Sequence, residues 1–248
     1  MPRTTTTQRK LPRLMSEDLT GRTLIELDRA RAHYLLDVMR RKVGDQVRLF
    51  NSENGEWLAK ISEAGRKRCQ LRVDLQLRPP EEEEGPTLLF APIKKARLDL
   101  LVEKATELGV RKLIPVKTRR SIVDRMNLER LRVISIEAAE QCERLSVPDI
   151  QDLQSLEQAL SNWPKDQPLY VADETGGGVP LLQALKREPG GRPPSFLVGP
   201  EGGFDPLELE WLSETSAVVT VDLGPRILRA ETAGMAMLTA WVLRASSS

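Results

Sequence analysis

The sequence predicts an α/β protein in two parts, a small β-barrel followed by an α/β domain with a mostly parallel sheet. Short stretches in which polar and apolar residues alternate fill the first 80 residues and predict the barrel. Beyond residue 86, buried strands alternate with helices, as in parallel sheets. Between the two stands "RPPEEEEGP" at 78–86, whose prolines, four glutamates and Gly-Pro pair suit neither a strand nor a helix. We therefore predict domains at 1–80 and 87–248, joined by a linker at 81–86.

The first part begins with a helix and continues with three strands. The helix is predicted over 28–40. The strands are predicted over 45–50, 55–61 and 69–77, and the Asn, Ser and Gly residues of "NSENG" place a turn between the first two. In the third strand, the alternation puts four apolar side chains on one face: Leu71, Val73, Leu75 and Leu77.

The second part repeats a strand followed by a helix. We predict strands over 87–93, 112–116, 169–173, 195–199 and 217–224. We predict helices over 95–108, 127–145, 205–214 and 230–244. Gly109 is a natural stop for the first of these helices, and Asn127 is placed to cap the second. This alternation of strands and helices predicts a largely parallel sheet.

Composition excludes several classes of protein. The chain has 248 residues and 40% hydrophobic residues, which is enough for a buried core. It holds no apolar run of the ~18 residues that a membrane span needs, and its first residues lack the apolar segment of a secretory signal. It has two distant cysteines, Cys69 and Cys142, and one histidine, His33, so neither a disulfide framework nor a metal site is expected. We expect a cytoplasmic protein with no membrane partner.

Charge is distributed unevenly along the chain. The first 80 residues hold 17 lysines and arginines against ten aspartates and glutamates, whereas the remainder holds 20 against 26. Such an asymmetry indicates that the basic part meets a polyanion. The alternative is that an arginine-rich composition scatters its charges by chance.

A glycine-rich loop stands inside "FLVGPEGGFDPLELEWL" at 196–212. A buried strand precedes the loop, and Asp205, Pro206 and Glu208 form a capping box with proline at the first helical position. Ligands of open α/β sheets bind beyond such strand ends. The loop lacks the Lys-Ser/Thr of a P-loop and the G-x-G-x-x-G of a dinucleotide site. Taken alone, it is consistent with either a structural turn or a ligand-binding loop.

A second polar loop follows a buried strand in "VDLGPRILRAETAGMA" at 221–236. It places Arg226, Arg229, Glu231 and Thr232 between apolar neighbours. Charged groups near buried backbone need partners, because an unpaired charge there is costly. The loop is therefore either a ligand-binding wall or a structural segment held by salt bridges.

Together the two loops resemble those of the RsmE family of 16S ribosomal RNA methyltransferases, which belong to the SPOUT superfamily of trefoil-knotted enzymes. The residues that carry the resemblance are "GPEGGF" at 199–204 and "LGPRILRAETA" at 223–233. Supporting stretches are "HYLLDVMRRKVGD" at 33–45, "EKATELGV" at 103–110, "RRSIV" at 119–123 and "EQCERLSVP" at 140–148. The resemblance covers essentially the whole chain, and the two loops are specific in this order and spacing. Glu143 stands where some members of the family have Gly.

The resemblance implies a PUA-like β-barrel domain followed by a SPOUT domain whose chain threads a deep knot. Members of the family are homodimers with active sites at the subunit interface. The implied reaction moves a methyl group from S-adenosylmethionine to N3 of a uridine near the 3′ end of 16S rRNA. The implied partner is 16S rRNA, and we expect the assembled small ribosomal subunit to be the substrate.

The resemblance also implies which residues bind the cofactor. A flat adenine needs apolar walls and backbone groups at its edge, and small residues allow that approach. The implied cofactor residues are Leu197, Gly199, Pro200, Glu201, Gly202, Gly203, Leu223, Gly224, Ile227, Leu228, Arg229 and Thr232.

For catalysis, we expect the Arg229 guanidinium to hydrogen-bond a uracil carbonyl and spread the charge that develops at N3. Glu231 is expected to orient Arg229 or to accept the N3 proton. Gln141 and Arg144 share a helix face with Glu137 and are expected to complete the site in a dimer. The alternative for that face is a solvated surface.

RNA contact is expected from the basic residues of the first part. Clusters of this kind contact phosphate and supply affinity more than sequence choice. Because aromatic residues make up only 4% of the chain, recognition by RNA shape is expected rather than base stacking. The expected RNA-binding residues are His33, Arg40, Arg41, Lys42, Arg66, Lys67 and Arg68.

Three other functions are weighed against this one. A SPOUT methyltransferase could act on a ribose 2′-hydroxyl or on another base. A non-catalytic RNA-binding factor in ribosome assembly would have no need of the two cofactor loops. A nicotinamide-dependent enzyme is disfavoured because its glycine fingerprint is absent.

Overall fold

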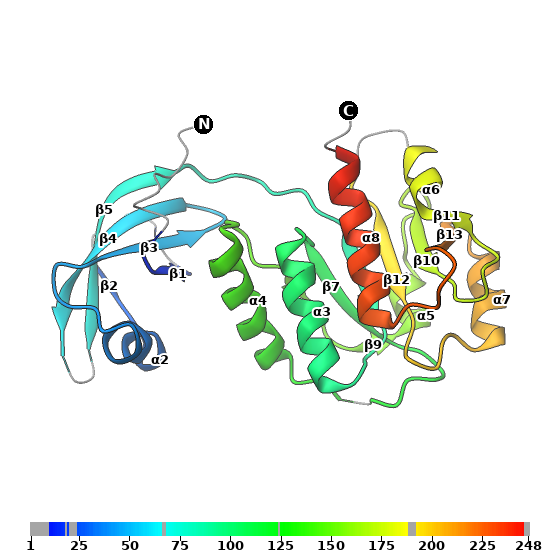
Figure 1. Ribbon diagram of the computed structural model, residues 1–248, viewed down its shortest axis with the longest axis horizontal. Coiled ribbons are helices and arrows are strands. Elements are labelled where there is room, and N and C mark those ends of the chain that lie inside the picture. The colour runs from blue at the N-terminus through cyan, green and yellow to red at the C-terminus, as the bar shows by residue number, and fades with distance from the viewer. Residues whose placement is uncertain are drawn as a thin grey trace. The chain divides into compact units, whose positions relative to one another are not determined.

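The computed structural model divides into two compact units (Figure 1). It describes residues 10–17, 19, 24–65, 68–123, 125–187 and 192–245. Unit 1 takes the chain up to Glu83 and also Ala139–Val147, and unit 2 takes the rest. The first division falls inside the stretch 81–86. The membership of Ala139–Val147 in unit 1 differs from the linear division predicted from the sequence, because helical periodicity does not reveal what the end of a helix contacts.

Unit 1 is built on one five-stranded sheet with the strand order β1-β3-β4-β5-β2. The strands are β1 (Arg13–Met15), β2 (Leu24–Glu26), β3 (Gln46–Asn51), β4 (Gly55–Ala64) and β5 (Cys69–Arg78). β1 pairs with β3 in parallel, and the other pairs are antiparallel. The three long strands confirm the predicted ones, whereas the three-residue β1 and β2 have no counterpart in the prediction.

A β-bulge breaks the alternation of β5. Consecutive residues of β4 pair with Leu75 and Val73, so Asp74 is an extra residue in β5. Leu71 is buried, but Leu75 is 57% exposed. The expectation that Leu75 lies on the same face of the strand as Leu71 and Val73 is therefore wrong.

The predicted helix of unit 1 is confirmed in two pieces. α2 (Arg29–His33) begins at an Asp28 cap, whose side chain accepts a hydrogen bond from the Arg31 backbone. It continues directly into a π-helical turn, η1 (Tyr34–Val38). Leu35 is fully buried in the core of unit 1.

Arg13 binds the segment Ala139–Val147 within unit 1. Its Nη1 and Nη2 atoms donate hydrogen bonds of 2.7 Å to the carbonyl oxygens of Ala139 and Arg144. Its Nε atom donates to the fully buried Glu56 carboxylate at 2.6 Å, and its guanidinium lies 3.4 Å from the centre of the Phe50 ring. Burial lowers the pKa of the Arg13 guanidinium. This one side chain therefore satisfies carbonyl groups that the end of a helix leaves without partners.

Glu143 adopts a backbone conformation that usually favours glycine. Its φ is +64°, in the left-handed region. Its side chain accepts a 2.9 Å hydrogen bond from Arg48, and its carbonyl oxygen accepts one of 2.8 Å from Arg78. The Glu143 side chain thus adds an ion pair within unit 1.

Unit 2 is built on a parallel sheet with the order β11-β13-β10-β12-β6-β7-β8, and β9 also pairs with β7. Every described strand pair in it is parallel, which confirms the predicted sheet. The strands are β6 (Thr87–Phe90), β7 (Lys112–Lys117), β8 (Asp149–Ile150), β9 (Gln154–Ser155), β10 (Leu169–Ala172), β11 (Val179–Pro180), β12 (Ser195–Val198) and β13 (Val218–Asp222). The knot that the resemblance implies stays a prediction.

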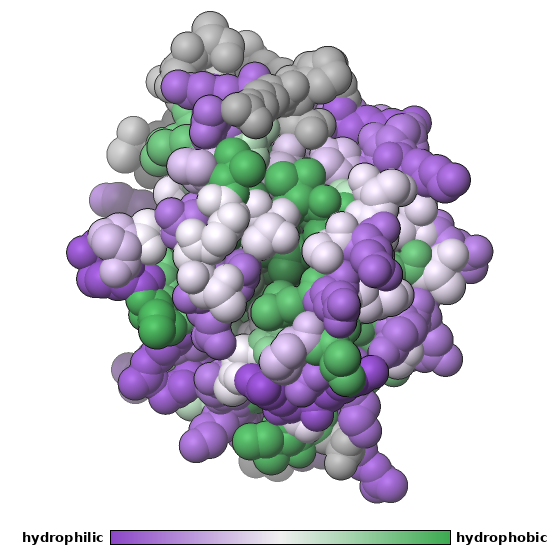
Figure 2. Space-filling model, turned by 90° about the vertical axis from the view of Figure 1, so that its right-hand side faces the viewer, coloured by the Kyte–Doolittle hydropathy of each residue, from purple (hydrophilic) through white to green (hydrophobic). Residues whose placement is uncertain are grey.

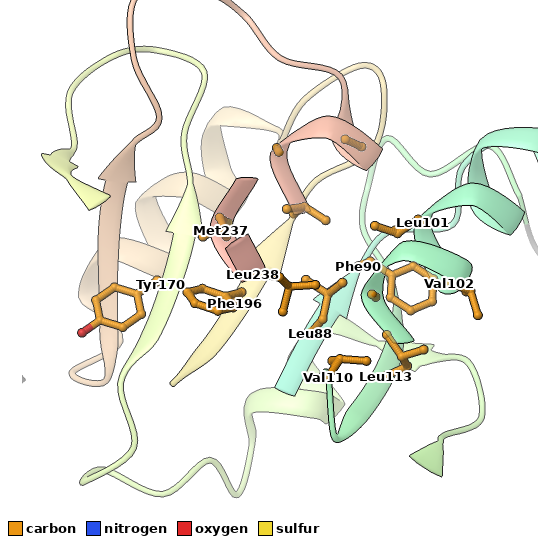
Figure 3. Close-up of a cluster of buried hydrophobic side chains, with 14 of the residues drawn as sticks. Leu88, Phe90, Leu101, Val102, Val110, Leu113, Tyr170, Phe196, Met237 and Leu238 are labelled. Carbon is orange, nitrogen blue, oxygen red and sulfur yellow. The ribbon is translucent and has the colours of Figure 1, made fainter. Parts of the chain in front are cut away.

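Helices cover both faces of this sheet. They are α3 (Lys95–Glu107), α4 (Leu128–Cys142), α5 (Leu156–Leu160), α6 (Leu181–Arg187), α7 (Pro206–Glu214) and α8 (Ala230–Ala245). Leu88 and Phe90 of β6 lie in one apolar cluster with residues of α3 and α8 (Figure 3). Residues of α6 also belong to this cluster. Leu89 points the other way, into a cluster with residues of α5 and α7. None of the helices in the described part of the chain is long and apolar enough to cross a membrane.

Candidate functional site

A hollow of about 540 Å³ lies at the carboxyl edge of the sheet of unit 2. It is lined by the loops that follow β10, β12 and β13 and by the start of α8. Figure 2 views the molecule from the side on which α7 lies, and apolar residues gather near the middle of that face with polar residues around them. The carboxyl edge of a parallel sheet is where ligands of α/β proteins bind, so this hollow is the candidate site.

The first glycine loop supplies part of the lining. Gly199, Pro200 and Gly203 line the hollow, whereas Leu197 is fully buried in the core beneath it. Glu201 and Gly202 are exposed on the turn and do not line it. The structure thus brings together half of the six cofactor residues predicted in this stretch.

Gly203 adopts a backbone conformation that favours glycine. Its φ is +67°, and a Cβ atom there would overlap the carboxylate of Glu174. At Gly199, a Cβ atom would lie 3.0 Å from the Phe204 ring. The glycines therefore make room for neighbouring side chains as well as exposing backbone groups.

The second loop supplies the opposite wall. Leu223, Gly224, Ile227 and Leu228 line the hollow, as do Ala230 and Ala233 at the start of α8. A third wall, missed by the sequence analysis, follows β10 and consists of Asp173, Glu174, Thr175 and Gly176. The signal was present in the sequence, because this polar stretch follows a predicted strand directly and so lies at the same edge as the two glycine loops.

Arg120, which also lines the hollow, comes from the loop after β7. Its Nη1 atom donates a 3.0 Å hydrogen bond to the carbonyl oxygen of Gly202, and its Nη2 atom lies 3.8 Å from Asp205. The backbone of Arg119 donates to Glu208 at 2.6 Å. The first glycine loop is therefore held from outside as well as by its own capping box.

Comparisons with known proteins agree with this arrangement. A family described as "RNA methyltransferase domain" matches residues 81–242, and a family described as "RNA methyltransferase PUA domain" matches residues 27–74. The chain belongs to the RNA methyltransferase family. The PUA match lies within unit 1, and the methyltransferase match contains all three walls of the hollow.

Similar proteins carry a common name. A "Ribosomal RNA small subunit methyltransferase E" from Rickettsia conorii is 36% identical over 203 residues, 82% of each chain. One of that name from Bacillus subtilis is 31% identical over 219 residues, 84% of this chain and 85% of the relative. The crystal structure of one from Neisseria gonorrhoeae bound to S-adenosyl methionine has a TM-score of 0.81 at 26% identity and covers 93% of this chain and 96% of that chain.

In this RNA methyltransferase, Glu231 does not contact Arg229 in the way the sequence analysis expected. Its side chain is 8% exposed, and its Oε1 atom lies 3.7 Å from the Nε atom of Arg97. The Oε2 atom of Glu231 is buried and has no hydrogen-bond partner among the described residues. Arg229 and Thr232 are exposed and do not line the hollow. The observed partner of Glu231 is Arg97, because the start of α8 packs against α3.

The other two predicted catalytic residues of the methyltransferase belong to unit 1. Gln141 is exposed. Arg144 is buried, and its guanidinium donates to Glu83 at 3.1 Å and to Ser146 at 2.7 Å. Neither residue lines the hollow of unit 2. These contacts hold Arg144 within unit 1, and the expected part of Gln141 and Arg144 in a dimeric site stays a prediction.

The predicted RNA-binding residues of the methyltransferase are exposed or partly exposed where the structure describes them. His33 lies 2.6 Å from Asp37, and Arg68 forms a 3.0 Å ion pair with Glu26 that raises the pKa of Arg68. Arg40, Arg41 and Lys42 follow η1 in one stretch. Arg66 and Lys67 lie outside the described residues.

A second hollow of the methyltransferase, of about 620 Å³, lies at the amino ends of β6, β7 and β8. Two of its cations are already paired, since Lys112 lies 3.9 Å from Asp149 and Arg192 lies 2.9 Å from Asp166. It lacks the converging loops of the first hollow. The hollow at the carboxyl edge therefore remains the candidate for chemistry.

Proposed function

We propose that this methyltransferase transfers a methyl group from S-adenosylmethionine to N3 of a uridine in 16S rRNA. We further propose that it acts in the cytoplasm, as a homodimer, on the assembled small ribosomal subunit. The observation that carries the proposal is the convergence of both predicted cofactor loops on one hollow at the carboxyl edge of the sheet. The S-adenosyl methionine in the similar protein from Neisseria gonorrhoeae supports the choice of cofactor.

The lining of the hollow suits this cofactor. About 540 Å³ is within the usual range of small-molecule sites. Leu223 and Leu228 offer apolar surface to a purine, and the glycine loops offer backbone groups. Asp173, Glu174 and Asp222 place carboxylates around a site that would take a cationic molecule. When bound, the cofactor supplies an electrophilic methyl group, and the protein supplies placement.

Arg229 is proposed as the catalytic residue. Its side chain is exposed, and no hydrogen bond or ion pair of its guanidinium is found among the described residues. It is therefore free to donate to a uracil carbonyl and stabilise the anion that forms when N3 loses its proton. Glu231 is better placed to position the loop than to accept that proton, because its carboxylate faces Arg97.

Unit 1 is proposed to bind RNA through Arg40, Arg41 and Lys42. These cations follow one another in an exposed or partly exposed stretch after η1. Contacts of this kind are made to phosphate, so binding should weaken steeply as salt rises.

The proposal is tested by incubating the purified protein with unmodified small subunits and, separately, with free 16S RNA. Mass spectrometry of the nucleosides is expected to show N3-methyluridine in the subunits. A different methylated nucleoside would favour another RNA position, such as a ribose 2′-hydroxyl. Transfer to neither substrate by the wild-type protein would overturn the proposal.

Two variants make the test specific to the site. Leu228→Trp, which fills part of the hollow, is expected to abolish binding of S-adenosylhomocysteine in calorimetry. Arg229→Ala is expected to keep that binding and lose turnover. Full turnover by Arg229→Ala would remove Arg229 from the mechanism, and a wild-type protein that binds no S-adenosylhomocysteine would favour a non-catalytic RNA-binding factor.

A further inference from the structure

Arg97, the third residue of α3, lies between the two loops that form the hollow. Its Nη1 atom is 3.9 Å from Oε1 of Glu201 in the first loop, and its Nε atom is 3.7 Å from Oε1 of Glu231 in the first turn of α8, directly after the second loop. Arg97 itself does not line the hollow. One guanidinium therefore connects the first loop to the start of the helix that follows the second loop, although Glu201 and Glu231 are 30 residues apart in the sequence.

Burial makes the contact with Glu231 significant. The Glu231 side chain is only 8% exposed, and a carboxylate removed from water needs a nearby cation. Within the described residues, Arg97 is the cation that forms an ion pair with it. Removal of Arg97 would thus leave a buried carboxylate without its counter-charge.

The elements on either side of Arg97 are fixed. Glu201 also accepts a 3.3 Å hydrogen bond from the backbone of Lys94, just before α3. Gly234 of α8 lies so close to α3 that a Cβ atom there would be 2.9 Å from a methyl group of Leu101. The first loop therefore contacts the start of α3 through Glu201, and α8, which follows the second loop, packs along the same helix.

We propose that Arg97 is a positioning residue that sets the spacing of the two cofactor loops through Glu201 and Glu231. This inference rests on the proposed function, because it states that Arg97 helps to set the shape of the pocket for S-adenosylmethionine. The role assigned to Arg97 needs no contact with the cofactor, because Arg97 does not line the hollow. Its loss should let the loops separate, which weakens cofactor binding and misplaces the methyl group relative to the uridine.

The test begins with Arg97→Met, which keeps the length of the side chain and removes its charge. Calorimetry with S-adenosylhomocysteine is expected to show binding weakened about tenfold, with the KM for the small subunit unchanged. Arg97→Lys should recover part of the affinity. Lys95→Met is the matched control, because Lys95 is an exposed cation in the same turn of α3, and it should bind as the wild type does.

A double-mutant cycle then separates positioning from direct contact. Arg97→Met combined with Glu201→Gln or with Glu231→Gln should weaken binding by less than the product of the single effects, because each pair acts through one interaction. Multiplicative effects in both cycles would overturn the inference, as would wild-type affinity in Arg97→Met.

Folding and function are followed separately in the same samples. Thermal unfolding shows whether Arg97→Met is folded. If it is not, the cofactor affinities of Arg97→Lys and Arg97→Gln are compared with that of the wild type instead. A wild-type protein that neither binds S-adenosylhomocysteine nor methylates RNA would contradict the proposed function. A functional wild type with unaffected Arg97 variants would contradict only the role of Arg97.

Discussion

The guanidinium of Arg120 donates a 3.0 Å hydrogen bond to the carbonyl oxygen of Gly202. This contact ties the loop after β7 to the first glycine loop, while Glu201 in the same loop faces Arg97. The loop is thus held at two consecutive residues by arginines from two different elements. A site binds its ligand more tightly when the loop that lines it already has its ligand-bound conformation.

Arg120→Met is expected to weaken binding of S-adenosylhomocysteine about five- to tenfold, because it removes one hydrogen bond worth about 1 kcal/mol from a partly exposed contact. Unfolding should change little, since the Arg120 side chain is 45% exposed. Arg119→Met is the control, because it keeps the backbone hydrogen bond to Glu208, loses a 3.6 Å ion pair with Asp205 similar to that of Arg120, and leaves the contact with Gly202 intact. Equal affinities for the two variants would contradict the role of Arg120.

Gly203→Ala is expected to lower the free energy of unfolding by about 1–2 kcal/mol, because φ at this residue is +67° and alanine is strained there. It should also weaken cofactor binding, since Glu174 must move away from the new methyl group. Gly202→Ala provides the comparison. There, the nearest atoms to the new Cβ are 3.9 Å away, and stability should stay within about 0.5 kcal/mol of the wild type. Denaturant unfolding measures both, and a larger loss at Gly202 would refute the explanation.

Arg13→Met is expected to destabilise unit 1 by about 3–5 kcal/mol, because it leaves the fully buried Glu56 with a weakened counter-charge. The double variant Arg13→Met with Glu56→Gln should lose less stability than the two single variants lose in total. Arg68→Met removes an exposed ion pair and should change the free energy of unfolding far less than Arg13→Met does. Unfolding of the full chain in guanidinium chloride measures the loss of stability in each variant. A small loss in Arg13→Met would show that the contacts of Arg13 contribute little.

The two cysteines are expected to react differently. Burial raises the pKa of the Cys69 thiol, so the folded protein disfavours its thiolate. The contribution of the Cys69 thiol to the free energy of unfolding should therefore fall as pH rises past about 8.5, because the thiol of the unfolded chain ionises there first. Iodoacetamide at neutral pH should label the partly exposed Cys142 first, and both residues should react in denaturant. Peptide mass spectrometry gives the order, and faster native labelling of Cys69 would contradict its burial.

Long elements of this fold could be predicted because each carries its signal locally. The Asp205 side chain accepts from the backbone of Leu207, and Glu208 accepts from the backbone of Asp205, so the predicted capping box of α7 is confirmed. Asn127 likewise accepts from the backbone of Arg130 at the start of α4. These contacts span two or three residues and are therefore visible in a short stretch of sequence.

The contacts that could not be predicted join residues far apart in the chain. Arg13 and Ala139 are 126 residues apart, and no periodicity connects them. The sequence places Arg97 in a predicted helix, and its contacts with Glu201 and Glu231 depend on how distant parts of the chain pack beside α3. Glu231 was assigned to Arg229 because the two are neighbours in sequence. Their side chains separate because α8 begins between them, at Ala230.

Because Ala139–Val147 belongs to unit 1, it limits how chimeras of such proteins can be built. Cutting the chain after Glu83 would remove the carbonyl partners of Arg13 and the apolar cover that Ala139 and Leu145 give to Phe50. An N-terminal part grafted from a relative would meet a foreign segment at that position. Chimeras of these enzymes should therefore inherit residues 139–147 from the same parent as the first 83, so the smallest exchangeable piece is discontinuous in the gene.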